Sequence, residues 1–231
     1  MPSLTAGRRS VRWLTAGAIV LIVVGVSLLI PGSTEDAACT LNAPARIAVD
    51  QAELEFTATK VCTGRGPSDV TWTAAVGSTE TSELRFRRTD SAVAQVFSND
   101  PFGQWTWTVT RTDRSGADYN APVTEVRAGS TVTVAAARQA SSGTEVTFQV
   151  NRYDPKASAM VPWAGATATI ESRKAPADDN APFAPAGSAT SDGEGIVVLT
   201  LRPRVDTQYR ARFADAAEVF GATSDYVFVG R

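Results

Sequence analysis

Beyond residue 40, hydrophobic and polar residues alternate along most of the chain, as they do in β-strands with one buried face. The alternation is clearest in three segments: DVTWTAAV (69–76), QWTWTVTR (104–111) and TEVTFQVNRY (144–153). No stretch shows the sustained three- and four-residue spacing of an amphipathic helix. Short strands separated by turn-forming residues are typical of β-sandwiches. The pattern therefore predicts an all-β body.

A break in the alternation at AGS, residues 128–130, divides the predicted strands into two sets. Each set is about the size of one seven-stranded sandwich. The two sets also end alike, in a strand, a turn and a strand, which indicates two divergent copies of one module. We therefore expect two tandem β-sandwich domains, residues 39–128 and 129–231.

One long apolar segment lies near the N-terminus, WLTAGAIVLIVVGVSLLI, residues 13–30, and it carries no charge. As a helix it would span about 27 Å, close to the thickness of a bilayer core. Three arginines and no acidic residue precede it, so the positive-inside rule places residues 1–12 in the cytoplasm and the body outside. We predict a single transmembrane signal anchor, followed by a linker over residues 31–38.

A cleaved signal peptide is the alternative to an anchor, although its apolar core is normally about 7–15 residues long. Cleavage after Ala37 or Ala38 would place Glu35 or Asp36 at a position that prefers a small residue. A lipid-modified Cys39 fits less well, because Asp36 stands where a lipoprotein box has an aliphatic residue. A buried core helix also fits less well, because the apolar segment is near the terminus and follows a basic flank. Both the signal anchor and the cleaved signal peptide would export the body.

Export would permit a disulfide between the only two cysteines of the chain. If residues 39–62 form one hairpin with its turn at the midpoint, Ile47 faces Leu54 and Cys39 faces Cys62 on the same side. Directly opposed strand residues lie about 4.5–5.5 Å apart at Cα, within disulfide reach. We predict a Cys39–Cys62 disulfide, with two free thiols or a redox pair as the alternatives.

The second half contains VPWAGATATIES, the turn SDGEG and VVLTLRPRVDTQYRARFADAAEVFGATSDYVFV, and it resembles bacterial Ig-like domains of exported surface proteins. In that family a D-x-x-G turn joins two strands, and Asp192 to Gly195 match it. A tyrosine near the start of the sixth strand forms the tyrosine corner, and Tyr209 occupies that place. The resemblance implies an Ig-like sandwich and implies little about function.

The first half resembles the same family less closely. Trp72 resembles the core tryptophan of the third strand, and Trp105 stands in the tyrosine-corner place. Trp107 stands where antibody domains have their second cysteine, so the resemblance implies that Cys62 pairs locally and not between sheets. The likeness covers roughly residues 40–231, and we expect two Ig-like sandwiches.

Charge and composition narrow the range of possible functions. Of 22 basic residues, three precede the apolar segment, which leaves 19 against 24 acidic residues in the remainder. This acidic body argues against a nucleic-acid partner. The chain has no histidine, so it lacks the commonest general base and a frequent metal ligand. We predict no catalytic residue, no metal and no cofactor, and hence not an enzyme.

Three other groups of residues are candidate sites. Asp178 and Asp179, with Asp192 and Glu194, offer oxygen ligands for calcium but lack a twelve-residue loop pattern, so polar turns are favoured. Trp163, in VPWAG, is the candidate ligand contact, although a packed loop aromatic is the simpler interpretation. The candidate basic patch, for which a solvated sheet face is the alternative, consists of Arg85, Arg87, Arg88 and Arg111.

We therefore predict a membrane-anchored extracytoplasmic protein that binds, adheres or assists another envelope protein without catalysis. Its partners would be the membrane, through the N-terminal helix, and an envelope protein or a cell-wall glycan. A carbohydrate-binding module is the first alternative and would need coplanar exposed aromatic side chains. A structural spacer is the second.

Overall fold

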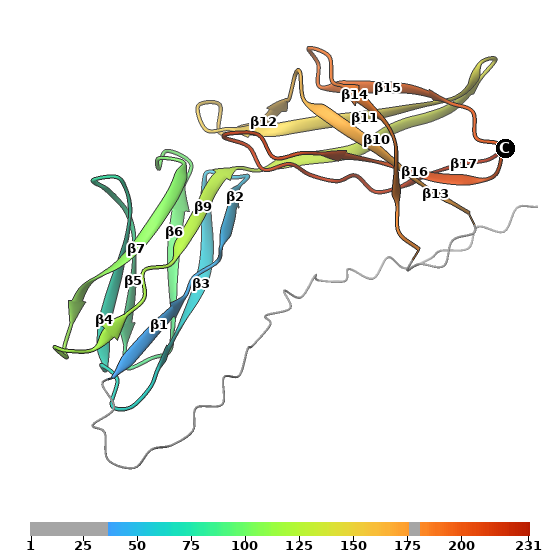
Figure 1. Ribbon diagram of the computed structural model, residues 1–231. Helices are drawn as coiled ribbons and strands as arrows, with labels where there is room; N and C mark the ends of the chain where they lie inside the picture. The colour runs from blue at the N-terminus through green and yellow to red at the C-terminus, as the bar shows by residue number, and fades with distance from the viewer. Residues whose placement is uncertain (1–36, 176–180) are drawn as a thin grey trace, which may run out of the picture. The chain divides into compact units, whose positions relative to one another are not determined.

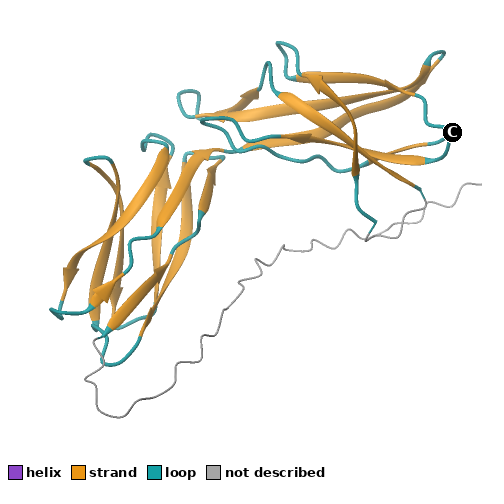
Figure 2. Cartoon of the chain, viewed as in Figure 1, coloured by secondary structure: helices purple, strands orange, loops and turns teal. Residues whose placement is uncertain are grey.

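The computed structural model describes residues 37–175 and 181–231. Throughout these ranges the chain forms strands, turns and loops, without a helix (Figure 2). Among these residues no helix is long and apolar enough to cross a membrane. The predicted anchor, its cytoplasmic flank and nearly all of the linker lie outside the described residues, as do Asp178 and Asp179. The prediction of an all-β body is confirmed.

Nine strands between Ala38 and Ala128 form two sheets, which we call the first sheet pair (Figure 1). Their orders are β6-β3-β1-β8 and β2-β9-β7-β4-β5. Strands β1, β3 and β6 on one sheet and β4, β7 and β9 on the other reproduce the Ig arrangement, with β5 extending the second sheet. The strands are β1 (Ala38–Asn42), β2 (Arg46–Val49), β3 (Glu53–Cys62), β4 (Asp69–Val76), β5 (Thr79–Arg87), β6 (Ser91–Phe97), β7 (Gly103–Thr112), β8 (Asp118–Tyr119) and β9 (Val123–Ala128).

Eight further strands form the second sheet pair, from Ser130 to Val229. One sheet places β11 between β10 and both β12 and β15, and the other has the order β14-β13-β16-β17. The strands are β10 (Ser130–Ala140), β11 (Gly143–Asp154), β12 (Ala159–Pro162), β13 (Thr167–Lys174), β14 (Ala184–Thr190), β15 (Ile196–Leu201), β16 (Thr207–Phe213) and β17 (Val227–Val229).

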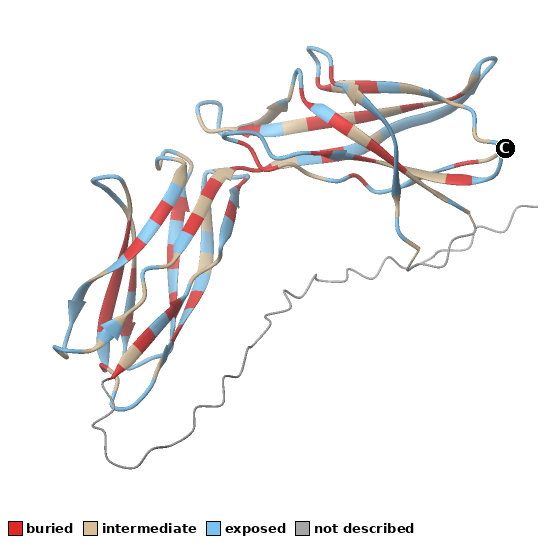
Figure 3. Ribbon diagram, viewed as in Figure 1, coloured by how far each residue is buried: buried red, intermediate tan, exposed pale blue. Residues whose placement is uncertain are grey.

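Each sheet pair surrounds its own hydrophobic core, and buried and exposed residues alternate along the strands (Figure 3). The first core includes three fully buried tryptophans, and the second is built around Phe148 and Ile170. The first core also takes in Tyr153 and Val219 from beyond the predicted boundary. By their contacts, the described residues 37–175 and 181–231 belong to one compact unit, so the division at residues 128 and 129 stays a prediction.

The predicted hairpin over residues 39–62 is right in its outer half and wrong in its inner half. Strands β1 and β3 pair with Cys39 opposite Cys62, as expected. However, Ile47 pairs with Val126 of β9 and Leu54 with Val96 of β6, so they lie in different sheets. The chain leaves the first sheet at the segment between β1 and β2, which contains a proline that cannot donate a ladder hydrogen bond.

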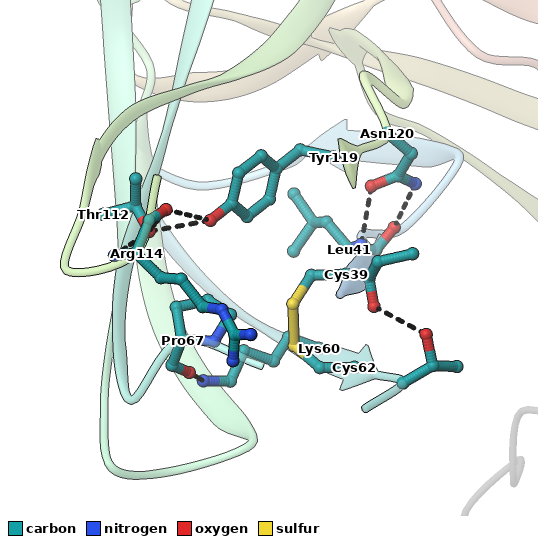
Figure 4. Close-up of a disulfide and its surroundings, with 11 residues drawn as sticks. Cys39, Leu41, Lys60, Cys62, Pro67, Thr112, Arg114, Tyr119 and Asn120 are labelled. Carbon is teal, nitrogen blue, oxygen red and sulfur yellow. Dashed lines mark hydrogen bonds between the residues drawn. A yellow bond between two sulfur atoms is a disulfide. The ribbon is translucent and has the colours of Figure 1, made fainter. Parts of the chain in front are cut away.

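The predicted disulfide is confirmed, with the two Cα atoms 4.1 Å apart (Figure 4). The bridge packs closely against the following loop, because a Cβ atom on Gly66 would lie 2.4 Å from the Cβ atom of Cys62. On the other edge of β1, the side chain of Asn120 accepts a hydrogen bond from Leu41 N and donates one to Leu41 O, at 2.7 and 3.0 Å. The first strand is therefore held on both edges.

The structure contains two of the motifs on which the Ig-like resemblance rests and lacks a third. Trp105, near the start of β7, donates from its indole nitrogen to Pro101 O at 2.9 Å, which is the bond of a tyrosine corner made by a tryptophan. In contrast, the hydroxyl of Tyr209 makes no hydrogen bond within the described part of the chain, so the tyrosine corner expected there is not formed. The turn from Asp192 to Gly195 joins β14 to β15 as expected, and Gly195 adopts a φ of 73° that favours glycine.

Removing the disulfide should destabilise the first sheet pair. Replacing both cysteines, Cys39→Ser with Cys62→Ser, opens a loop of 23 residues' separation, and we expect the free energy of unfolding to fall by about 3 kcal/mol. Urea unfolding followed by tryptophan fluorescence measures this change. The control is Val61→Ala at an exposed neighbouring position, which should shift the free energy by less than about 0.5 kcal/mol. An equal shift in both proteins would contradict the prediction.

Candidate functional site

The outward face of β4, β5 and β7 forms a polar trough in the first sheet pair, with β4 as its floor. Trp72 points into the core, so the residues on either side of it, Thr71 and Thr73, point outward. Their side chains are short, whereas the flanking strands carry longer ones. Cross-strand pairing sets Glu83 beside Thr73, and both Arg85 and Arg111 beside Thr71.

The trough consists of two adjoining depressions of about 410 and 350 Å³. Both are lined by Arg111, which therefore lies where they meet. The larger depression is lined mainly by hydroxyl groups and two carboxylates, from Thr73, Glu80, Thr81, Ser82, Glu83 and Thr110. The smaller one is more basic, with Arg85 and Arg87 on its rim. The trough thus presents hydrogen-bonding groups in an open surface hollow.

A β-bulge shapes the floor of the trough. The pairing of β4 with β7 shifts register between Thr71 and Trp72, which leaves Thr110 as an extra residue on β7. Its hydroxyl forms a hydrogen bond of 2.8 Å with the hydroxyl of Thr73. Bulges of this kind redirect a side chain and are frequent beside binding sites. Here the bulge adds a hydroxyl to the floor.

Arginines hold the Glu83 carboxylate of the trough in its ionised form. The side-chain hydrogen bond from Arg85 lowers the pKa of Glu83, and the positive charges of Arg85, Arg111 and Arg87 add to this effect against partial desolvation. The same hydrogen bond raises the pKa of Arg85. At the end of the trough, Asp113 accepts a 2.5 Å hydrogen bond from Ser68, which lowers its pKa as well. At neutral pH the site therefore carries fixed charges.

This arrangement suits binding better than proton transfer. Glu83 is ionised and tied to Arg85, so it is a poor general acid. The hydroxyls of Thr73 and Thr110 bond to each other. Guanidinium groups and hydroxyls can instead donate to a polar ligand, and Glu83 can accept from one.

The structure supports part of the predicted basic patch. Arg85, Arg87 and Arg111 come together at the trough. Arg88 does not line it, because it occupies the turn after β5 with a φ of 55°. The sequence analysis missed Glu83, whose importance depends on the arginines around it. The signal for the threonines was present, since they alternate with the core residues in VTWTA (70–74) and WTWTVTRT (105–112).

Trp163 packs instead of standing free. Its indole is half-buried, lies against both cores and has its ring centroid 6.4 Å from that of Phe213. Its backbone is also fixed, since the Trp163 carbonyl accepts a 2.6 Å hydrogen bond from Ser191. A ligand contact by Trp163 stays a prediction.

Among the calcium candidates, the carboxylate of Asp192 has local partners. One carboxylate oxygen of Asp192 accepts hydrogen bonds from the backbone N–H groups of Glu194 and Ile196, at 3.1 and 2.8 Å. This is turn chemistry. Across residues 37–175 and 181–231, no group of three or more acidic, cysteine or histidine side chains is placed to hold a metal ion.

Comparisons with known proteins find similarity among solved structures, at low identity. No protein-family model matches the chain, and no curated protein matches it. Among solved structures, E. coli alpha-2-macroglobulin aligns at 8% identity and a TM-score of 0.38, over 85% of this chain and 14% of that one. The D0-D1 domain of intimin aligns at 16% and 0.30, over 85% and 98%. A tetra-tandem repeat of a large adhesion protein aligns at 15% and 0.29, over 84% and 49%.

These similarities are too low to carry any statement about function. The Ig-like character of the first sheet pair follows from its strand order, which places β1, β3 and β6 opposite β4, β7 and β9. The chain spans about a seventh of the macroglobulin and half of the adhesin repeat structure.

The carboxyl group of Glu83 should titrate below the usual range of glutamate. A group whose folded-state pKa is lowered contributes stability above its unfolded pKa, and this contribution is lost as the pH falls through the folded value. NMR titration of the side-chain carboxyl carbon measures the midpoint. In Arg85→Met the midpoint should move up, because the main hydrogen bond is lost. In Arg65→Met, an exposed arginine outside the trough, it should stay; an unchanged midpoint in Arg85→Met would contradict the assignment.

Proposed function

We propose that this chain is a non-catalytic binding protein of the cell envelope. In this proposal residues 13–30 anchor it in the cell membrane with residues 1–12 in the cytoplasm. Its body, outside the membrane, consists of two tandem Ig-like sandwiches, residues 39–128 and 129–231. Its role is to bind, or to assist, another envelope component.

The trough is the observation that carries the binding role. It is open, polar and held in shape by hydrogen bonds between its own side chains, such as those of Glu83 with Arg85 and Thr73 with Thr110. A preorganised surface of this kind gains affinity because little side-chain freedom is lost when a ligand binds. The Glu83 carboxylate is ionised and bound to Arg85, which suits binding better than proton donation.

The disulfide supports the proposed compartment. Structural disulfides persist outside the cytosol and are rare within it. The Cys39–Cys62 bridge lies at the first residues of the body, close after the apolar segment 13–30. An anchor that exports the chain on its C-terminal side would deliver both cysteines to an oxidising compartment.

The trough does not favour the alternative of a glycan-binding module. Such a module would use a platform of exposed aromatic rings, and the aromatic residue that lines the trough, Phe86, is fully buried. Trp72, Trp105 and Trp107 are fully buried as well. A ligand in the trough would therefore be recognised by hydrogen bonds and charge, which suits a protein surface.

Thiol labelling in intact cells tests the proposed topology. With a membrane-impermeant maleimide, the native cysteines should react only after treatment with an impermeant reductant, because they are paired outside the membrane. In the Cys39→Ser, Cys62→Ser background, Ser10→Cys should stay unlabelled until the cells are lysed. Free native thiols, or labelling of Ser10→Cys in intact cells, would refute the topology. A mature protein that lacks the first 30 residues by mass would refute the anchor and support the signal peptide.

A further inference from the structure

A second surface lies on the outward face of the sheet β14-β13-β16-β17. Alternation creates it: Ala211 and Phe213 of β16 point into the second core, so Arg210 and Arg212 point outward. We call this surface the arginine–aromatic face, and its members are Glu171, Arg173, Phe183, Gln208, Arg210, Arg212, Tyr226 and Phe228. Cross-strand pairing aligns them in rows, with Glu171 beside Arg210, and with Gln208 between Arg173 and Phe228.

A buried carboxylate organises the arginines. Glu171 is only 6% exposed, and its two oxygens lie 2.7 Å from Arg210 Nε and 3.8 Å from an Arg212 nitrogen. A buried carboxylate needs partners of this kind, because leaving it unpaired would be costly. Since Glu171 is already engaged, it holds the two guanidinium groups in place and is not itself offered to a partner. The Arg212 side chain remains 63% exposed.

Phe183 packs between two guanidinium groups. The centre of the Arg210 guanidinium lies 4.2 Å from the Phe183 ring centroid, and that of Arg173 lies 4.6 Å from it. Arg173 also donates to Gln208 at 2.6 Å. Guanidinium groups stack well on aromatic rings, and such stacking restricts their rotamers. Arg210 is therefore presented in a fixed geometry before any partner arrives.

Two large aromatic side chains extend the face into solvent. Tyr226 and Phe228 are 52% and 55% exposed, and they alternate with Val227, so they lie on the same side. Arg173 lies 5.6 Å from the Tyr226 ring centroid, which joins them to the arginines. Arginine and aromatic residues together are the composition enriched in protein–protein interfaces and their hot spots.

We propose that the arginine–aromatic face docks an acidic, partly apolar segment of a partner protein. Carboxylates of that segment pair with Arg210 and Arg212, and its apolar side chains cover Tyr226 and Phe228. Charge complementarity assigns the acidic character, because Arg210 and Arg212 share the one carboxylate of Glu171 and the Arg212 side chain remains exposed. The exposed rings favour a protein segment over a purely polar polymer. This inference rests on the proposed binding function and names the partner's chemistry and its docking face.

A synthetic peptide of ten alternating Glu and Leu residues, with a fluorophore and a central photoreactive residue, is the probe. The full chain is held in nanodiscs of zwitterionic lipid, and binding is measured by fluorescence polarisation. We expect saturable binding that weakens as salt is raised, and an adduct that maps by mass spectrometry to 207–213 or 226–229. A matched peptide of Lys and Leu should not bind.

Charge reversal supplies the decisive comparison. Arg212→Glu changes an exposed residue and should weaken binding at least about tenfold, since it sets a like charge against the peptide. Phe228→Ser should weaken it through lost apolar contact and leaves the arginines intact. The control is Arg65→Glu, an exposed charge reversal in the first sheet pair, which should leave the affinity unchanged. Unfolding midpoints of all three variants check the fold.

Equal affinity in Arg212→Glu and the native chain would overturn the proposal, as would an adduct elsewhere or no binding. Chemical cross-linking without peptide that joins this face in two chains would assign it to a second copy, which also overturns the proposal. These failures are distinct from failure of the proposed function. If the proposed function fails, thiol labelling would place the body in the cytosol, whether or not the peptide binds.

Discussion

Burial of three indoles between two sheets is the constraint from which the first sheet pair follows. Trp72, Trp105 and Trp107 are completely buried, and each indole N–H has an acceptor: Asn120 O, Pro101 O and the Thr124 hydroxyl, respectively. A slip of one residue in β4 or β7 would expose these rings and bury the threonines between them. The register is therefore strongly specified, and the outward residues that form the trough are specified with it.

Alternation along the strands also separates core residues from surface residues in the second sheet pair. The inward residues of β16 and β17 fill the core, and the outward ones carry the guanidinium groups and exposed rings of the arginine–aromatic face. Cores of sandwiches are filled by side chains, so a fold of this kind offers its faces and loops for recognition. The trough and the arginine–aromatic face are both open sheet faces, which suits contact with another large molecule.

The alternation of hydrophobic and polar residues made much of the fold predictable, but it could not reveal which strands pair across the two sheets. It predicted the strands, their inward faces and the register that opposes Cys39 to Cys62. It could not reveal that Ile47 and Leu54 lie in different sheets, because residues on two facing sheets point toward the same core and alternate alike. It could not reveal the pairing of Glu83 with Arg85 or the packing of Phe183 between arginines. Such contacts depend on bulges and on strands distant in sequence.

Arginine side chains also pair with several carboxylates on the described surface. Glu83 is paired with Arg85 and Glu171 with Arg210; the pKa of Asp215 is lowered by the Gly221 N–H and, secondarily, by Arg46. Guanidinium groups stay charged at every physiological pH, and the chain has no histidine to titrate near neutrality. Carboxylates with lowered pKa values lose their contribution to stability only as the pH falls through those values. The charges of Glu83 and Asp215, and of the arginines beside them, therefore stay constant from neutral to mildly acidic pH.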